Sequence, residues 1–160
     1  MQVRRQLFLG RRLLALVLGT IAASALADSH SPAERAIHYR HSLYHVIEWN
    51  VNAMGDVIKG KTAYDPAAFS LHATRVANLV PMILEGFPPG SYIEGRTAAK
   101  ETVWTDRATF EGLLRKLGER SAALASVAAG NDLAAIKPAF NTLVDTCEEC
   151  HKKFKNKSDH

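Results

Sequence analysis

The chain has only two cysteines among its 160 residues, and both lie near the C-terminus, within the stretch TCEECHKKFK. Cys147 and Cys150 are three positions apart, and His151 follows directly. Thiolates are nucleophiles and metal ligands, and imidazole is the commonest metal ligand in proteins. On a helix the spacing i, i+3, i+4 places all three side chains on one side. The stretch is therefore a candidate site for metal or cofactor chemistry.

Several chemistries use these residue types. A lone histidine on an apolar stripe is usually a core residue. A zinc site would need a further ligand, which is usually a thiol, and the chain has no other cysteine. A thioredoxin-like dithiol needs a strand-to-helix setting, which is absent here. Cys-x-x-Cys-His is the attachment motif of c-type haem: the thiols of Cys147 and Cys150 bond to the vinyl groups, and His151 binds the iron as proximal ligand. We interpret the motif as the site of one covalent haem c per chain.

The first 27 residues have the layout of a secretory signal peptide. A leader with four arginines precedes a mostly apolar run from Leu13 to Leu26, and Ala25-Leu26-Ala27 is a small-x-small cleavage site. An uncleaved membrane anchor is the alternative, but the apolar run is short for a span. Twin arginines hint at export of a folded chain. Haem attachment to an unfolded chain favours general secretion instead. We expect cleavage after Ala27 and export to the periplasm, without stable membrane association.

Removal of residues 1–27 changes the charge of the chain. The leader carries four arginines and no acidic residue, so the mature chain has 20 − 4 = 16 basic and 16 acidic residues. A balanced net charge gives no general reason to expect nucleic-acid binding. The remaining asymmetry is a lysine cluster just after the motif, which by default is a solvated face. Its members are Lys152, Lys153, Lys155 and Lys157.

Residues 28–160 predict four helices and one domain. Ser31, Pro32 and Glu34 start the first helix, which extends to about Lys59. Asp65 and Pro66 start the second, which Pro81 should kink or shorten, and a Gly- and Pro-rich loop covers 86–102. The third runs from Thr105 or Asp106 to Ala129, and Asn131 or Asp132 caps the fourth. Apolar residues recur at helical spacing, and no segment shows strand periodicity. We expect an all-α, antiparallel (up-down-up-down) four-helix bundle with the haem in its interior.

The chain resembles the class II c-type cytochromes, and within them the cytochrome c′ family, because its haem motif lies near the C-terminus. The stretches YRHSLY (39–44), WNVNAMGDVIKGKTAYD (49–65) and VWTD (103–106) also resemble that family. The resemblance implies that Arg40 contacts a haem propionate and that Lys155 stands beside the proximal imidazole. Arg40 also lies within the apolar stripe of its helix, where a charge needs a partner or a path to solvent. We expect His41 to touch the haem edge.

The residue on the distal side of the iron distinguishes two functions. Relatives that act as low-spin electron carriers place a methionine one helical turn after the arginine, and this chain has Tyr44 there. A protonated tyrosine is a poor ligand for ferrous iron. We therefore expect five-coordinate, high-spin iron with Tyr44 packed over its open face. Met54 and His72 are alternative sixth ligands, although their positions favour core roles.

The resemblance implies a periplasmic haem protein that binds NO or CO, with a role in NO binding, storage or detoxification, and that cycles between ferric and ferrous states. The alternative is a low-spin, six-coordinate, one-electron carrier whose lysines steer an acidic redox partner. We do not expect an enzyme, since no distal His–Arg pair suited to peroxide cleavage is evident.

The first helix has a second, weaker apolar stripe, which predicts a second packing partner. The family resemblance favours a homodimer through the first two helices, and packing under the 86–102 loop is the alternative. The stripe consists of Tyr39, Val46, Trp49, Ala53 and Val57.

Overall fold

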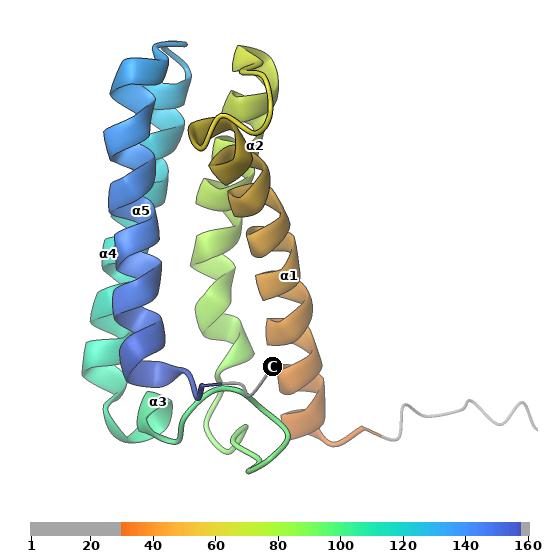
Figure 1. The fold of residues 1–160 in the computed structure, drawn as a ribbon. Coiled ribbons are helices and arrows are strands. Elements are labelled where there is room, and N and C mark those ends of the chain that lie inside the picture. Colours follow the sequence, from red (N-terminus) through yellow and green to blue (C-terminus); the bar gives the residue numbers. More distant parts are fainter. Residues whose placement is uncertain (1–29, 158–160) are drawn as a thin grey trace, which may run out of the picture.

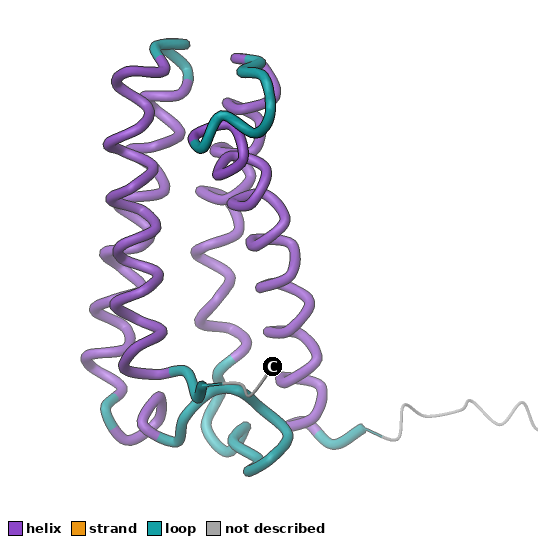
Figure 2. The backbone as a smooth tube through the Cα atoms, viewed as in Figure 1, coloured by secondary structure: helices purple, strands orange, loops and turns teal. Residues whose placement is uncertain are grey.

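The structure, a computed structural model, describes residues 30–157. Four long helices form an antiparallel bundle in up-down-up-down order, and the described residues contain no strand (Figures 1 and 2). The predicted leader and its cleavage site lie outside the described residues. The elements are α1 (Pro32–Ile58), α2 (Pro66–Leu79), the 3₁₀ segment η1 (Val80–Gly86), α3 (Thr102–Thr105), α4 (Arg107–Ala128) and α5 (Leu133–Phe154).

The predicted start of α1 is confirmed. The hydroxyl of Ser31 accepts a hydrogen bond from the backbone N–H of Glu34 at 3.2 Å, and the Glu34 carboxylate accepts one from the Ser31 N–H at 2.8 Å. This capping box satisfies two N–H groups that the helix itself cannot pair. The helix ends at Ile58, and Gly60 follows with φ 71°, a left-handed conformation that glycine adopts without steric cost.

The predicted break at Pro81 is also confirmed. Asp65 caps α2 by accepting from the N–H groups of Ala67 and Ala68. The α-helix stops at Leu79 and continues as the 3₁₀ segment η1. Proline lacks the N–H that an α-helical hydrogen bond requires, which explains the change.

The connection before the third long helix is more ordered than predicted. It contains the single turn α3, and α4 then begins at Arg107. Asp132 caps α5, whereas Asn131 before it takes the left-handed conformation with φ 59°. Pro138 lies inside α5 without ending it.

Three helix pairs hold the bundle together: α1 packs on α2, α2 on α4, and α4 on α5. Backbone contacts between α1 and α5 are sparser than in these three pairs, and Figure 1 shows the two helices side by side but apart. Residues 87–101 cross one end of the bundle. The end of α5 is tied to this crossing segment, since Lys100 N–H donates to the Phe154 carbonyl at 2.9 Å and Asn156 N–H to the Ala98 carbonyl at 2.8 Å. The cysteine motif thus lies near the crossed end.

One stretch of the bundle has the length and composition of a membrane span. Pro66–Gly86 reaches a mean hydropathy of 1.2. Its buried residues include Phe69 and Val76 of α2 and Ile83 of η1, all of which belong to the common core. We therefore assign the stretch to the bundle.

Candidate functional site

The last turns of α5 present the two thiols to the bundle core. Cys147 and Cys150 are half-buried, pack against the core and are both free. His151 lies on the same side of the helix but is exposed. Part of the imidazole ring is nevertheless covered by protein. This burial, followed by the charge of Lys155, lowers the pKa of the imidazole. A neutral imidazole is the form that binds iron.

The thiols are not activated for redox exchange. Burial, followed by the neighbouring Cys147 and Glu149, raises the pKa of Cys150 to about 11. Burial also raises the pKa of Cys147. Reactive dithiols of the thioredoxin type have lowered pKa values and attack as thiolates. The electrostatics of this site therefore disfavour an exchanging dithiol.

Tyr44 of α1 reaches the same region from the opposite helix. Burial, with a smaller contribution from Cys150, raises the pKa of its phenol well above the ordinary value. Its ring meets the edge of Phe87 at a centroid distance of 6.4 Å. The structure thus brings a neutral, partly buried phenol close to the thiols.

A groove lined by both apolar and polar residues lies between α1 and α5. Val51 and Gly55 line it from α1, and Phe140 and Val144 line it from α5. The cavity has a volume of about 760 Å³. Val144 precedes Cys147 by three residues, so the groove and the thiols share one side of α5.

Arg40 is the buried cation of the site, with 2% of its surface exposed. Its guanidinium donates to the backbone carbonyls of Gly86 and Ser91, each at 3.0 Å. It also lies 5.0 Å from the ring centroid of Phe87 and 5.6 Å from that of Trp104. Sequence reasoning missed these partners, since none lies near Arg40 in the chain. Gly86 and the Pro-Gly turn before Ser91 mark a loop but do not indicate where it packs.

One donor of Arg40 remains available. Among the residues that the structure describes, its buried Nε finds no hydrogen-bond acceptor. A buried donor without a partner costs about 1–3 kcal/mol. Every acceptor already bound to this guanidinium is neutral, so the cation lacks a counter-charge within its hydrogen-bonding shell. An anionic group such as a haem propionate fits both features.

His41 and Lys155 have weaker links to the site. His41 is exposed, and burial followed by the charges of Arg40 and His45 lowers the pKa of its imidazole. The structure gives it no contact with the thiols. Lys155 is exposed at the end of α5, where its charge acts on His151 and its backbone pairs with Ala99.

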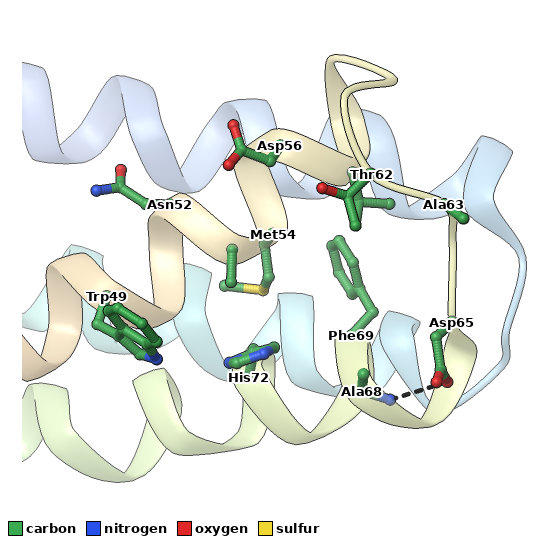
Figure 3. Close-up of a pocket in the computed structure, with 12 residues that line it drawn as sticks. Trp49, Asn52, Met54, Asp56, Thr62, Ala63, Asp65, Ala68, Phe69 and His72 are labelled. Atoms are coloured by element: carbon green, nitrogen blue, oxygen red, sulfur yellow. Dashed lines mark hydrogen bonds between the residues drawn. The ribbon is translucent and has the colours of Figure 1, made fainter.

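Met54 and His72 lie elsewhere. Met54 is fully buried, as its position in the sequence favours. The two side chains point toward each other, from α1 and α2, across a cavity of about 400 Å³ (Figure 3). His72 Nδ1 is 2.8 Å from Asn50 Oδ1. Because this cavity is lined by α1, α2 and the loop between them, the structure does not bring either residue to the thiols on α5.

The residues present fit a covalently attached haem. Two thiols and an adjacent imidazole share one side of α5 with the groove, and the buried guanidinium of Arg40 offers an unused donor. A structural zinc site, which uses four protein ligands, fits less well, since no group of three or more His, Cys, Asp or Glu side chains in residues 30–157 is gathered to hold a metal ion.

The family model described as "Cytochrome C'" matches residues 35–155. The chain belongs to the cytochrome c′ family. Cytochrome c′ from Rhodospirillum rubrum is 29% identical over 145 residues, which cover 91% of this chain and 97% of that protein. Cytochrome c′ from Shewanella frigidimarina has a solved structure that is 35% identical, with a TM-score of 0.75 over 79% of this chain and 98% of that one.

A third cytochrome c′ was solved with a gas. The ferrous form of a variant from Alcaligenes xylosoxidans with bound NO is 25% identical, with a TM-score of 0.74, and the match covers 81% of this chain and 99% of that one. Membership of the cytochrome c′ family implies a covalently bound haem c, and the chain has both cysteines that such attachment uses.

Proposed function

We propose that this chain is a haem c protein whose iron is five-coordinate and high-spin and binds NO or CO. The observation that carries the proposal is the placement of Tyr44. A partly buried, neutral phenol lies close to the thiols, at the position where low-spin carriers of the family have a methionine ligand. Such a residue crowds the distal face without occupying the sixth coordination position.

Different residues would hold different parts of the haem. Cys147 and Cys150 provide the covalent attachment, His151 provides the iron ligand, and Nε of Arg40 is suited to a propionate. Lys155 adds positive charge beside His151. A bound haem supplies an iron that exchanges one electron and accepts a sixth ligand.

The proposed role is NO binding and tolerance in the periplasm, after export and cleavage following Ala27. The NO-bound Alcaligenes xylosoxidans cytochrome c′ supports the choice of ligand. Ligand binding with one-electron cycling requires no catalysed conversion of a substrate, so we do not assign an enzyme activity.

One-electron transfer is the second candidate. Exposed lysines surround the end of α5, and such a patch attracts an acidic redox partner. Lys152 and Lys153 are partly neutralised by carboxylates, at 3.6 Å from Glu148 and 2.8 Å from Asp106. This neutralisation weakens the patch and places electron transfer second.

We also propose that the protein forms a homodimer through α1 and α2. Val46 and Trp49 of α1 are 49% and 73% exposed, and Leu71 of α2 is 50% exposed. The alternative, packing under the crossing segment, does not account for Val46 and Trp49, because both remain exposed. Within the same stripe, Tyr39 is instead used inside the chain, since its hydroxyl donates to the Glu85 carboxylate at 3.0 Å.

Absorption spectroscopy of the purified haem-loaded protein tests the main proposal. We expect the dithionite-reduced protein to show the broad bands of a high-spin, five-coordinate iron, and to change to a sharper spectrum when CO or NO is added. Narrow paired bands that ignore the gas would indicate a sixth protein ligand. That result would overturn the gas-binding proposal in favour of the electron carrier.

A further inference from the structure

The first half of α1 is rich in histidines that the proposed function does not require. Four of the seven histidines in the chain fall within residues 30–45. His38, His41 and His45 recur at i, i+3 and i+7, so they form one stripe along the helix. All three are exposed. A helix surface normally carries Lys, Glu or Arg in such positions, which makes a row of imidazoles notable.

His41 and His45 have the spacing of a chelating pair. Residues four apart on a helix are neighbours, with Cβ atoms about 5–6 Å apart. Two imidazoles at i and i+4 bind one zinc ion in helical metal sites.

Glu48 extends the stripe by one turn and adds a negative charge to it. Its Oε2 is 3.7 Å from Nδ1 of His45. A carboxylate at this distance attracts a cation bound to the neighbouring ring.

We propose that His41 and His45 chelate a divalent ion of the zinc class, with Glu48 as a neighbouring negative charge and water completing the coordination. Imidazole ligands suit Zn²⁺, Cu²⁺ and Ni²⁺ and discriminate against Mg²⁺ and Ca²⁺. Since no group of three or more His, Cys, Asp or Glu side chains is gathered for a metal in the described part of the chain, the site is a two-residue chelate. It requires no haem and no particular coordination state of the iron.

The competing pair is His30 and His38. Their rings meet edge to face at a centroid distance of 4.9 Å. The eight-residue separation places His30 before the start of α1, so helix geometry does not hold this pair in register. We therefore assign the ion to His41 and His45.

Calorimetric titration of the haem-loaded protein with Zn²⁺ tests the proposal. Loss of an outer-shell partner alone costs about 10- to 100-fold in metal affinity, and loss of a ligand should cost no less. We expect one ion per chain, a decrease of at least about tenfold for His45→Gln, and unchanged affinity for His38→Gln. Unchanged affinity in His45→Gln, or an equal loss in His38→Gln, would overturn the assignment.

A rescue variant tests the spacing itself. In the His45→Gln background, Ser42→His places an imidazole four residues after His38 on the exposed face of α1. We expect it to restore Zn²⁺ binding, whereas Val46→His, which stands five residues after His41, should not. Failure of Ser42→His to restore binding would overturn the i, i+4 chelate. The CO-bound absorption spectrum of His45→Gln should match the wild type, so that misfolding and failure of the gas-binding proposal are recognised separately.

Discussion

Tyr44 is the residue on which the proposed ligand chemistry depends. Its ring is partly buried near the thiols, and its hydroxyl is protonated at every physiological pH because burial raises its pKa. In the proposed arrangement an incoming diatomic would displace this packed ring, which at typical overpacking energies costs about 1–3 kcal/mol. The side chain would then limit gas affinity by its volume.

Truncation of this ring should therefore strengthen gas binding. A relief of about 1–3 kcal/mol corresponds to a rise in CO affinity of about 5- to 150-fold for Tyr44→Ala. Tyr44→Phe keeps the ring volume and should leave the affinity near the wild-type value. Absorption titration of the ferrous proteins with CO measures both. A large change in Tyr44→Phe would instead assign the effect to the hydroxyl.

The backbone of η1 passes very close to α1 at Gly86. A Cβ built on Gly86 would lie 2.7 Å from Cβ of Arg40 and 3.1 Å from Cδ1 of Tyr39. The Gly86 carbonyl also accepts a hydrogen bond from Arg40 at 3.0 Å. Only a residue without a side chain allows the chain to pass α1 here and bring the crossing segment over the buried guanidinium.

Gly86→Ala should separate η1 from α1. We expect overpacking to lower the free energy of unfolding by about 1–3 kcal/mol, as measured by urea denaturation. Gly118→Ala is the matched control, since a Cβ there would lie 4.0 Å from its nearest neighbour, Val80. In the interior of α4 this change should stabilise by about 0.5–1 kcal/mol. Equal effects at the two positions would contradict the close-approach argument.

For the whole molecule, the apolar surface on α1 and α2 predicts assembly. Trp49, the most exposed large apolar residue described, is 73% exposed, and Val46 of α1 and Leu71 of α2 are also exposed. Large aromatic residues contribute most of the binding energy at protein interfaces. A second copy of the chain packed on α1 and α2 would bury these exposed side chains.

Trp49→Glu should weaken that dimer. Loss of an interface hot spot costs about 2 kcal/mol or more, which is about a 30-fold rise in the dissociation constant. Light scattering across a concentration series measures it, with Glu119→Lys on the exposed surface of α4 as the charge-changing control. A wild-type protein that stays monomeric at high concentration would refute the dimer.

Features that depend on a few consecutive residues could be predicted from the sequence. Ser31 and Asp65 were identified as helix caps, Pro81 as a break and Gly60 as a stop, and the structure confirms all four. The haem motif is also a local feature, because residues at i, i+3 and i+4 share one side of any helix that they form. The α-helical class and the order of the bundle followed from the same local patterns.

Contacts between distant segments were decided by the tertiary structure alone. The carbonyls that bind Arg40 lie 46 and 51 positions further along the chain. Tyr39 of the second stripe donates a hydrogen bond to Glu85, 46 positions further along the chain, whereas Trp49 in the same stripe remains exposed. A helical pattern shows which residues share a face, but it contains no information on which loop covers that face. The path of the crossing segment sets these contacts, because it depends on the packing of all four helices at once.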